Sequence, residues 1–294
     1  MPELPEVETI VRELRDKRAR IIGARFLDVW TDNKNMVKKP KDFNVFKQEI
    51  KGKKIKNIIR RAKNILFYLS DGKVLLVHQK MTGHFLFSKW KRGNNKWIAV
   101  AKGPFSEDPM NRFLHLVFWL DNGKMLALSD LRKFAKAEFW DEKELKESAY
   151  FKSLGPEPLE KSFNYNSFKK ALERKKGKIK QVLLDQTVIA GIGNIYSDEI
   201  LFTAKIKPTK NIPDLSEKEK KNIYLGIKKI LSLAVKLRGE SFSDFRRITG
   251  EKGFYDKARK VYRKEGEECP VCGEKIQKIK IGGRSAHFCP KCQK

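Results

Sequence analysis

The chain has 294 residues, 40% of them hydrophobic, which is enough for two or three modules with a real core and excludes a wholly disordered protein. It carries 65 Lys and Arg residues against 36 Asp and Glu residues, a formal net charge of +29. Such a surface attracts polyanions, and we expect nucleic acid because neutralised phosphates release counterions; an anionic membrane is the weaker alternative.

The first predicted element is a helix that starts at Pro5. Apolar residues recur at helical spacing from residue 7 to 14, with acidic residues in the first turn and basic residues in the last. Pro2 and Glu3 should form a short extended arm before it. Removal of Met1 would expose the secondary amine of Pro2, a nucleophile beside the Glu3 carboxylate. The alternative is an ordinary chain start whose acids only decorate a helix N-terminus.

From residue 21 to about 140 the pattern changes to short β-rich runs, with hairpin signals at Asp71-Gly72 and Asn122-Gly123. We therefore predict an antiparallel β-sandwich with a leading helix over residues 1–142, from which the basic stretch 88–112 departs as a surface excursion. Residues 143–158 indicate a linker, and 159–262 an α-helical domain ending in a loop. With a cysteine module over 263–294, the fold class is α+β and multidomain.

The cysteine module has the most specific spacing in the chain. Two Cys-x-x-Cys pairs are separated by 16 residues: Cys269, Cys272, Cys289 and Cys292. This spacing predicts a closed tetrahedral site for one structural zinc ion, and disulfides are the alternative. The alternating residues between the pairs predict a zinc ribbon with Gly282-Gly283-Arg284 at its tip, where an exposed arginine suits a phosphate.

The clustering of the cysteines also indicates a reducing compartment, because a disulfide framework would spread them along the chain. No stretch approaches 18 uncharged apolar residues, and the acidic, proline-containing N-terminus is unlike a signal peptide. We therefore expect a cytoplasmic, nucleoid-associated protein with no membrane partner.

A glycine-rich turn, Ala190-Gly191-Ile192-Gly193-Asn194, leads into a predicted helix. Backbone N–H groups at a helix N-terminus bind phosphate, and Asn194 would lie at or near the cap. The basic neighbours at 174–176 and Lys180 favour this interpretation. A tight interhelical turn that needs small residues is the alternative.

Three stretches of the β domain place cations beside apolar side chains: Lys63 in Arg60-Arg61-Ala62-Lys63, Met81 in the 78–84 turn, and the alternating 129–134 run. Each is compatible with ordinary surface. Together they offer wedges beside cations, as a protein needs to enter a duplex and hold it open.

With these motifs in order, the sequence resembles the formamidopyrimidine-DNA glycosylase family essentially from end to end. The resemblance rests on the N-terminal Pro-Glu-Leu-Pro-Glu-Val-Glu-Thr, on Gly-Ile-Gly-Asn-Ile-Tyr and on the terminal cysteine ribbon. It implies a helix–two-turn–helix DNA-binding domain with a lesion-capping loop. It also implies a monomeric enzyme that excises oxidised purines from double-stranded DNA by an N-terminal Schiff base, cleaves the strand by β,δ-elimination, and needs no organic cofactor.

The resemblance also implies a role for each matching residue. Pro2 would be the nucleophile, Glu3 the general acid and base, and Glu6 a second acid. Lys63 and Arg284 would bind phosphate and assist elimination. The remaining matches would contact DNA around the lesion: Met81, Arg132 and Phe134 as the wedge, and Asn194, Lys180 and the Arg174–Lys176 cluster, Lys175 included, on phosphate and lesion.

The sequence departs from the family pattern in the wedge loop, where Leu131 and Ala135 replace a proline and a glycine. A family histidine aligns with Phe113, so that contact stays unassigned. The nearest rival activity is an endonuclease VIII-type glycosylase for oxidised pyrimidines, which typically has glycine where this chain has Leu4. A non-catalytic DNA-binding protein would be expected to lack Pro2, Glu3 or Lys63.

Overall fold

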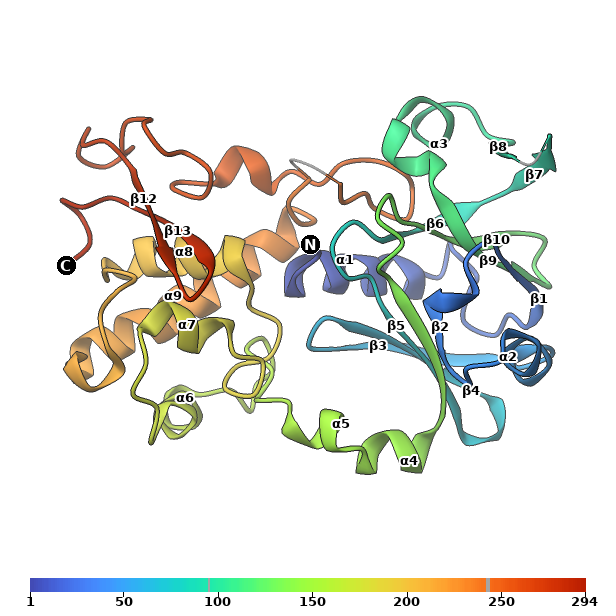
Figure 1. Cartoon of the computed structure of the whole chain (residues 1–294), viewed down its shortest axis with the longest axis horizontal. Coiled ribbons are helices and arrows are strands. Elements are labelled where there is room, and N and C mark those ends of the chain that lie inside the picture. Colours follow the sequence, from blue (N-terminus) through green and yellow to red (C-terminus); the bar gives the residue numbers. More distant parts are fainter. Residues whose placement is uncertain (95, 242–243) are drawn as a thin grey trace. The chain divides into compact units, whose positions relative to one another are not determined.

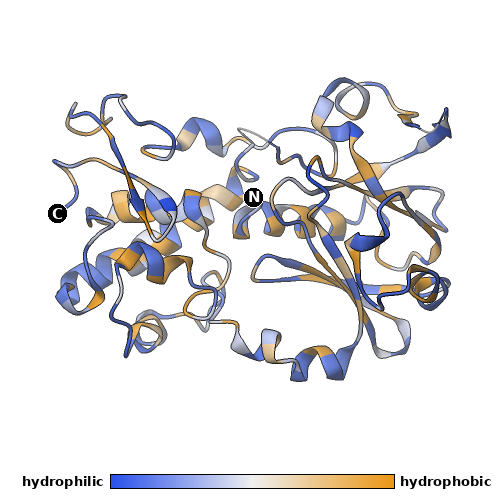
Figure 2. Cartoon of the chain, in the orientation of Figure 1, coloured by the Kyte–Doolittle hydropathy of each residue, from blue (hydrophilic) through white to orange (hydrophobic). Residues whose placement is uncertain are grey.

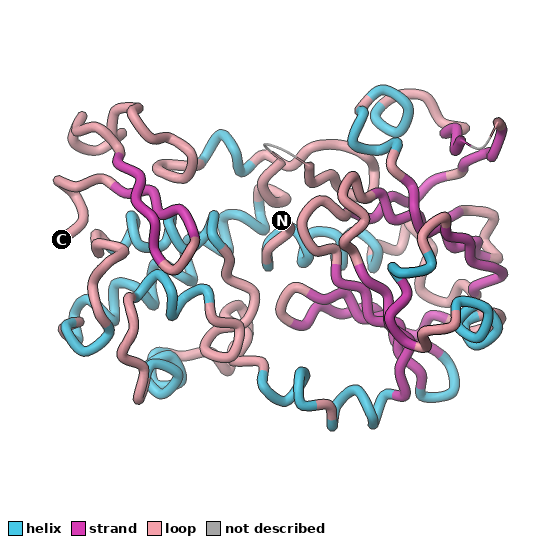
Figure 3. Tube along the Cα trace, in the orientation of Figure 1, coloured by secondary structure: helices cyan, strands magenta, loops and turns pink. Residues whose placement is uncertain are grey.

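The computed structural model describes residues 1–94, 96–241 and 244–294, so one residue of the predicted excursion and two of the predicted loop lie outside the described residues. The chain forms two compact units. The first is Met1–Lys152 with Leu237–Phe254, and the second is Ser153–Lys236 with Tyr255–Lys294. Strands dominate the first unit and helices the second (Figures 1 and 3). Among the described residues, no helix combines the length and apolarity that a membrane crossing requires.

The first unit contains two sheets, with strand orders β1-β9-β10-β6 and β2-β11-β5-β4-β3. The strands are β1 (Phe26–Thr31), β2 (Val37–Lys39), β3 (Ile55–Arg61), β4 (Asn64–Leu69), β5 (Lys73–His78), β6 (His84–Ser88), β9 (Leu114–Leu120), β10 (Met125–Ser129) and β11 (Lys136–Asp141). Pairing is antiparallel, as predicted, except that the short β2 runs parallel to β11. Both predicted hairpin turns are present, and Asp71, Gly72 and Gly123 all have positive φ.

The largest apolar cluster described in the first unit contains residues of both sheets. Phe67 of β4 meets Phe85 of β6 edge-on with ring centroids 5.8 Å apart, and Phe26 of β1 lies 5.3 Å from Phe118 of β9. Hydrophobic residues colour much of the strands and parts of α1 (Figure 2), and the apolar residues of α1 are buried. Helix α1 (Leu4–Arg15) adds Val7 and its apolar neighbours to this core. The sheets therefore form the predicted sandwich with α1 packed onto it.

Shorter elements complete the first unit. They are α2 (Phe43–Ile50), the hairpin β7 (Trp90–Gly93) and β8 (Lys96–Ala99), α3 (Pro104–Glu107), α4 (Glu142–Glu147), α5 (Ala149–Ser153) and the 3-10 turns η1 (Lys34–Met36), η2 (Ser70–Gly72) and η3 (Pro109–Arg112). The described residues of the excursion, 88–94 and 96–112, thus contain the paired strands β7 and β8 followed by two short helical turns. Two short helices also occupy much of the segment predicted as a linker.

The second unit is built around α8, which is buried along almost its whole length. Its elements are α6 (Tyr165–Leu172), α7 (Ile179–Leu184), α8 (Asn194–Ala204), η4 (Ile212–Asp214), α9 (Glu217–Lys236), η5 (Tyr255–Ala258) and the antiparallel hairpin β12 (Gln277–Ile281) and β13 (Arg284–Phe288). Helix α8 packs against α9 on one side and against β13 on another. The predicted helical domain and terminal ribbon are therefore both present.

Candidate active site

The N-terminal arm has the predicted geometry. Glu3 is extended, with φ −103° and ψ −169°, and α1 starts at Leu4 with Pro5 in its first turn. The backbone N–H of Glu3 donates to Glu6 Oε2 at 2.8 Å in a capping box. Glu3 and Glu6 are almost fully buried, whereas Met1 is 45% exposed. Pro2 is thus held in a fixed arm, next to a methionine that is accessible for removal.

Lys63 lies in the two-residue turn between β3 and β4, where Arg61 pairs with Asn64. Ala62, the other turn residue, has φ +53° and accepts a hydrogen bond from Arg60 Nη1 at 3.1 Å. Arg60 also bonds Glu8 of α1 at 2.9 Å, and α1 packs on β3 and β4. The Lys63 hairpin is thereby fastened to the helix that carries the N-terminal arm.

The strand register places the three stretches that combine basic and apolar residues at the same end of neighbouring strands. His78, the last residue of β5, pairs with Asn64 on one side and with Lys136 on the other. The Lys63 turn, the 79–83 turn and the 130–135 loop therefore leave neighbouring strands at the same end. Burial, together with the charges of Lys80, Lys136 and Lys63, lowers the pKa of His78 to about 3. A neutral His78 accepts the Lys80 N–H at Nδ1, which places its own proton on Nε2.

Met81, Arg132 and Phe134 form one exposed cluster, which we call the wedge cluster. Arg132 Nη1 lies 3.2 Å from the Met81 sulfur, and its guanidinium carbon lies 4.6 Å from the Phe134 ring centroid. Met81 is 39% exposed and Phe134 50% exposed. Exposed apolar side chains stiffened by a stacked guanidinium can enter a base stack.

Asp130 organises the wedge cluster, a role that was not apparent from its place in the sequence. Its fully buried carboxylate accepts the Thr82 hydroxyl and the N–H groups of Arg132 and Ala135, the latter two at 3.2 and 2.7 Å. The turn that carries Met81 and the loop that carries Arg132 are thus joined at one residue. An aspartate that starts a turn is a known signal for such bonds, but its partner Thr82 is 48 residues away.

In the second unit, the glycine turn between α7 and α8 is held by Gln186. Its side chain donates to the carbonyls of Leu184 and Ile192 at 2.9 and 2.8 Å and accepts the Gly191 N–H at 2.8 Å. Gly191 has φ +90°, so glycine is favoured there. Asn194 is the first residue of α8, and its side-chain oxygen is buried without a hydrogen-bond partner among the described residues. This oxygen can accept a hydrogen bond from a water molecule or a ligand at the turn.

Lys180 is not a surface cation, and the structure contradicts its prediction as a direct phosphate contact. Its side chain is fully buried, and its ammonium pairs with Asp198 and donates to Ser197. The other Asp198 oxygen accepts the backbone N–H and Nδ1 of His287 in β13 at 3.0 and 2.9 Å. Lys180 therefore joins α7 to α8 and, through Asp198, to the ribbon.

Glu199, the residue after Asp198 in α8, holds the segment 260–262. The buried Glu199 carboxylate accepts three successive backbone N–H groups, those of Lys260, Val261 and Tyr262, at 2.9 to 3.0 Å. Burial raises the pKa of Glu199, against the effect of these hydrogen bonds. Tyr262 in turn packs edge-on against His287, with ring centroids 5.2 Å apart.

Tyr262 and His287 border a polar pocket of about 630 Å³ within the second unit. It is lined by Asn194, Tyr262, Arg263, Glu265, Lys278, Ser285 and His287. Arg284 immediately precedes one lining residue and is exposed at the start of β13, while a Cβ on Gly282 would lie 2.4 Å from Gln181 of α7. The ribbon tip therefore packs close to α7. Lys175, by contrast, lies between α6 and α7 with its ammonium 3.7 Å from Asp185.

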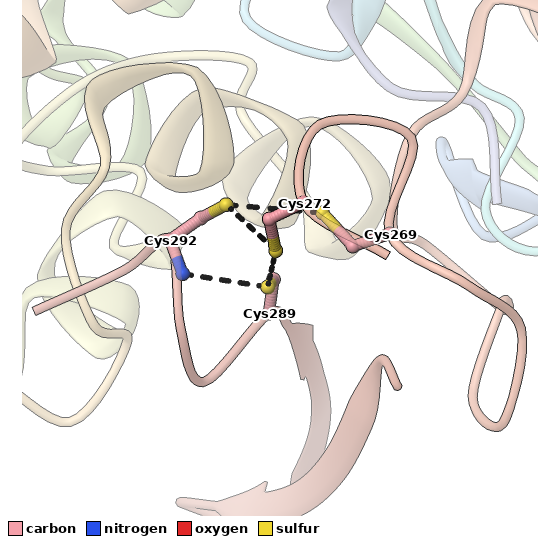
Figure 4. A group of neighbouring side chains, drawn as sticks. All are labelled: Cys269, Cys272, Cys289 and Cys292. Atoms are coloured by element: carbon pink, nitrogen blue, oxygen red, sulfur yellow. Dashed lines mark hydrogen bonds between the residues drawn. The ribbon is translucent and has the colours of Figure 1, made fainter. Parts of the chain in front are cut away.

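The four cysteines converge as predicted (Figure 4). Their sulfurs all lie within 4.8 Å of one another, with separations that include 3.3, 3.5 and 3.8 Å. Tetrahedral zinc with Zn–S bonds of about 2.3 Å needs sulfurs about 3.8 Å apart, so this cluster fits the ion. Phe202 of α8 and Val261 pack beside it. The site is closed and structural.

Comparison with known proteins gives three matches in chain order. Residues 1–137 match the formamidopyrimidine-DNA glycosylase N-terminal domain, 154–246 its H2TH domain, and 266–294 a zinc finger found in FPG and IleRS. A formamidopyrimidine-DNA glycosylase of Desulforamulus reducens is 37% identical over 100% of this chain and 99% of its own length.

Two solved structures of Lactococcus lactis Fpg bound to DNA also match, each with a TM-score of 0.84 and 35% identity. One holds DNA with an oxidised pyrimidine and covers 100% of both chains. The other holds DNA with Fapy-dG and covers 99% of this chain and 100% of its own.

Proposed function

We propose that this chain, which belongs to the formamidopyrimidine-DNA glycosylase family, excises oxidised purines from double-stranded DNA and then cleaves the strand as a lyase. The observation that carries the proposal is the N-terminal arm. Pro2 and Glu3 are held before α1 by the capping box, so that removal of exposed Met1 leaves a secondary amine beside a carboxylate.

In the proposed reaction, the damaged nucleotide is turned out of the stack and the Pro2 nitrogen attacks C1′ of its sugar. The N–C1′ bond forms as the glycosidic bond breaks, and the base leaves with a proton. The C1′–O4′ bond of the resulting aminal then breaks as O4′ takes up a proton, which leaves an open-chain iminium. The iminium withdraws electrons and acidifies the C2′ proton, so the 3′-phosphate leaves by β-elimination. A second elimination then releases the 5′-phosphate and leaves a one-nucleotide gap. Glu3 is the proton carrier we assign to these steps.

The other residues supply charge and shape. Lys63, in the turn beside His78, and Arg284, at the ribbon tip, are assigned to the phosphates that flank the lesion. The wedge cluster of Met81, Arg132 and Phe134 would fill the space that the flipped nucleotide leaves.

In the second unit, Asn194 and the polar pocket beside it would hold the DNA backbone, and Lys175 would add charge. We assign one zinc ion to the four cysteines and no organic cofactor to the reaction. We also propose that the protein is a monomer with sequence domains 1–142, 159–262 and 263–294, of which residues 237–254 pack with the first unit.

Oxidised pyrimidines are a second candidate substrate class. This proposal is favoured by one observation, the complex of a 35% identical relative with DNA that contains an oxidised pyrimidine. The two substrate classes differ in the damaged base that the active site must accommodate, and the chemistry at C1′ is the same for both.

Parallel excision assays test the proposal. Demethionylated protein is incubated with duplexes that contain 8-oxoguanine opposite cytosine, thymine glycol, or no lesion. We expect a one-nucleotide gap with phosphate at both ends, formed faster on 8-oxoguanine than on thymine glycol and absent on the undamaged duplex. Glu3→Gln should slow excision while duplex affinity is kept. Binding of the lesion duplexes without cleavage of either would instead identify a non-catalytic DNA-binding protein.

A further inference from the structure

Glu6 makes two backbone contacts that serve different parts of the chain. Its Oε2 accepts the N–H of Glu3, in the N-terminal arm, at 2.8 Å. Its Oε1 accepts the N–H of Glu240 at 2.8 Å. Glu6 is only 1% exposed. A single buried carboxylate therefore joins the arm that carries Pro2 to a segment more than 230 residues further along the chain.

That segment, Leu237–Phe254, belongs to the first unit and is closed at its base. The N–H of Phe254 donates to the Leu237 carbonyl at 2.8 Å, and that of Gly253 to the Ser241 hydroxyl at 2.8 Å. A Cβ on Gly253 would lie 2.3 Å from two carbonyl oxygens of the same base. The two ends of the segment are thus packed together directly beside Glu6.

Gly239 packs directly against Glu6, and a side chain at residue 239 would have no room. It has φ +80°, and a Cβ there would lie 2.9 Å from Glu6 Oε1 and 3.0 Å from Glu6 Cγ. An alanine would therefore push on the carboxylate itself. The contact between segment and arm can be disturbed from either side, by a change at Glu6 or by one at Gly239.

A second carboxylate on α1 holds the same segment elsewhere. Glu13, two helical turns after Glu6, accepts Arg247 Nε at 2.6 Å and the Ile248 N–H at 3.2 Å. Glu13 also lies 3.9 Å from Nη1 of Arg238, the residue before Gly239, so it holds the segment near its base as well. Glu13 takes no part in the bonds from Glu6 to the Glu3 and Glu240 N–H groups, so Glu13→Gln weakens the attachment of the segment while those two bonds stay in place.

We propose that Glu6 is a positioning residue for the Pro2 nucleophile. Residues 239–240 hold the Glu6 carboxylate, which in turn fixes the position of the Pro2 amine. The inference rests on the proposed role of Pro2. A carboxylate can accept both N–H groups at once, whereas an amide accepts one and turns its own N–H₂ toward the other. Misplacing a reacting group by about 1 Å can cost roughly a hundredfold in rate, so the effect should appear in the chemical step.

Single-turnover trapping tests this. Demethionylated variants are mixed with an 8-oxoguanine duplex and borohydride, and the maximal rate and the half-saturating protein concentration are measured separately. We expect Glu6→Gln and Gly239→Ala each to lower the maximal rate by roughly tenfold or more. The half-saturating concentration should change less than about threefold, and the double variant should be no slower than the slower single one.

Two matched controls accompany them. Glu13→Gln removes the other carboxylate contact to the segment, and Gly52→Ala introduces alanine at a comparable φ of +76° with nothing within 4 Å of its Cβ. Both should keep the maximal rate within about threefold, which is small beside the expected loss. All rates are measured at a temperature well below the midpoint of thermal unfolding of each variant. If Glu6→Gln does not fold, Gly239→Ala alone tests the positioning role.

The outcomes separate the inference from its premise. If Glu6→Gln or Gly239→Ala is trapped as fast as the wild-type protein, the positioning role is overturned and the proposed Schiff base stands. Slowing of Glu13→Gln to the same extent overturns that role as well, because the effect would then be one of general stability. No trapping by the wild-type protein removes the proposed function itself.

Discussion

Replacing Lys180 by methionine should destabilise the second unit. Lys180 and Asp198 are both fully buried, so the variant leaves a buried carboxylate without its ammonium. Removing one partner of a buried pair costs about 3–5 kcal/mol, and the two His287 N–H groups that Asp198 keeps place the cost near the lower end. With a urea m value of about 2–3 kcal/mol per molar, the unfolding midpoint should fall by about 1 M.

The distribution of chromophores lets this loss be assigned to one unit. All five tryptophans lie before residue 152, in the first unit, whereas α8 and α9 lie in the second. Urea unfolding of the zinc-loaded Lys180→Met variant should therefore shift the circular dichroism transition at 222 nm more than the tryptophan fluorescence transition. Lys180→Met/Asp198→Asn should recover at least half of the loss, because no charge then remains buried.

Salt dependence distinguishes this account from a direct phosphate contact. A lysine on a phosphate contributes about 0.9 to the slope of log affinity against log salt. Exposed Lys176 is the matched control. Lys176→Met should keep the urea midpoint and, if it contacts phosphate, lower the slope. A Lys180→Met variant that unfolds like the wild type but shows the reduced slope would refute our reasoning.

Three further results are expected. Cys289→Ala should abolish zinc in the purified protein, measured by atomic emission, together with tight duplex binding; unchanged zinc would contradict the cluster as its site. Asp130→Asn should lower the free energy of unfolding, followed by tryptophan fluorescence, by about 2 kcal/mol because it cannot accept all of its donors, and an unchanged midpoint would oppose this. Burial lowers the pKa of His84 to about 4 from its ordinary 6.5, so below pH 6.5 the unfolded state binds the proton that the folded state excludes. Unfolding free energy should therefore fall between pH 6.5 and 4, by up to about 1.4 kcal/mol per pH unit for this group; His84→Gln should flatten that fall, and an identical slope would argue against it.

The features that could be predicted from sequence are those that depend on residues close to one another in the chain. Helical spacing and Pro5 predicted α1, the Asp71-Gly72 and Asn122-Gly123 turns predicted hairpins, and the cysteine spacing predicted the metal cluster. Each depends on contacts within about 20 residues, so the chain itself displays the pattern.

What the sequence did not show depends on distant partners. Lys180 looks like one more cation beside a basic run, and only the packing of α7 on α8 reveals Asp198 as its counterion. Asp130 could not be matched to Thr82, because strand pairing brings them together. The same holds for Glu6 and Glu240, since residues 237–254 continue from α9 in sequence but belong to the first unit.

The central claim is that the Pro2 amine forms a covalent intermediate with the sugar. Demethionylated protein should be mixed with an 8-oxoguanine duplex and borohydride, digested, and the modified peptide sequenced by mass spectrometry. The account predicts a reduced DNA adduct on the nitrogen of Pro2. An adduct on a lysine such as Lys63, or none at all under conditions where the duplex is bound, would contradict it.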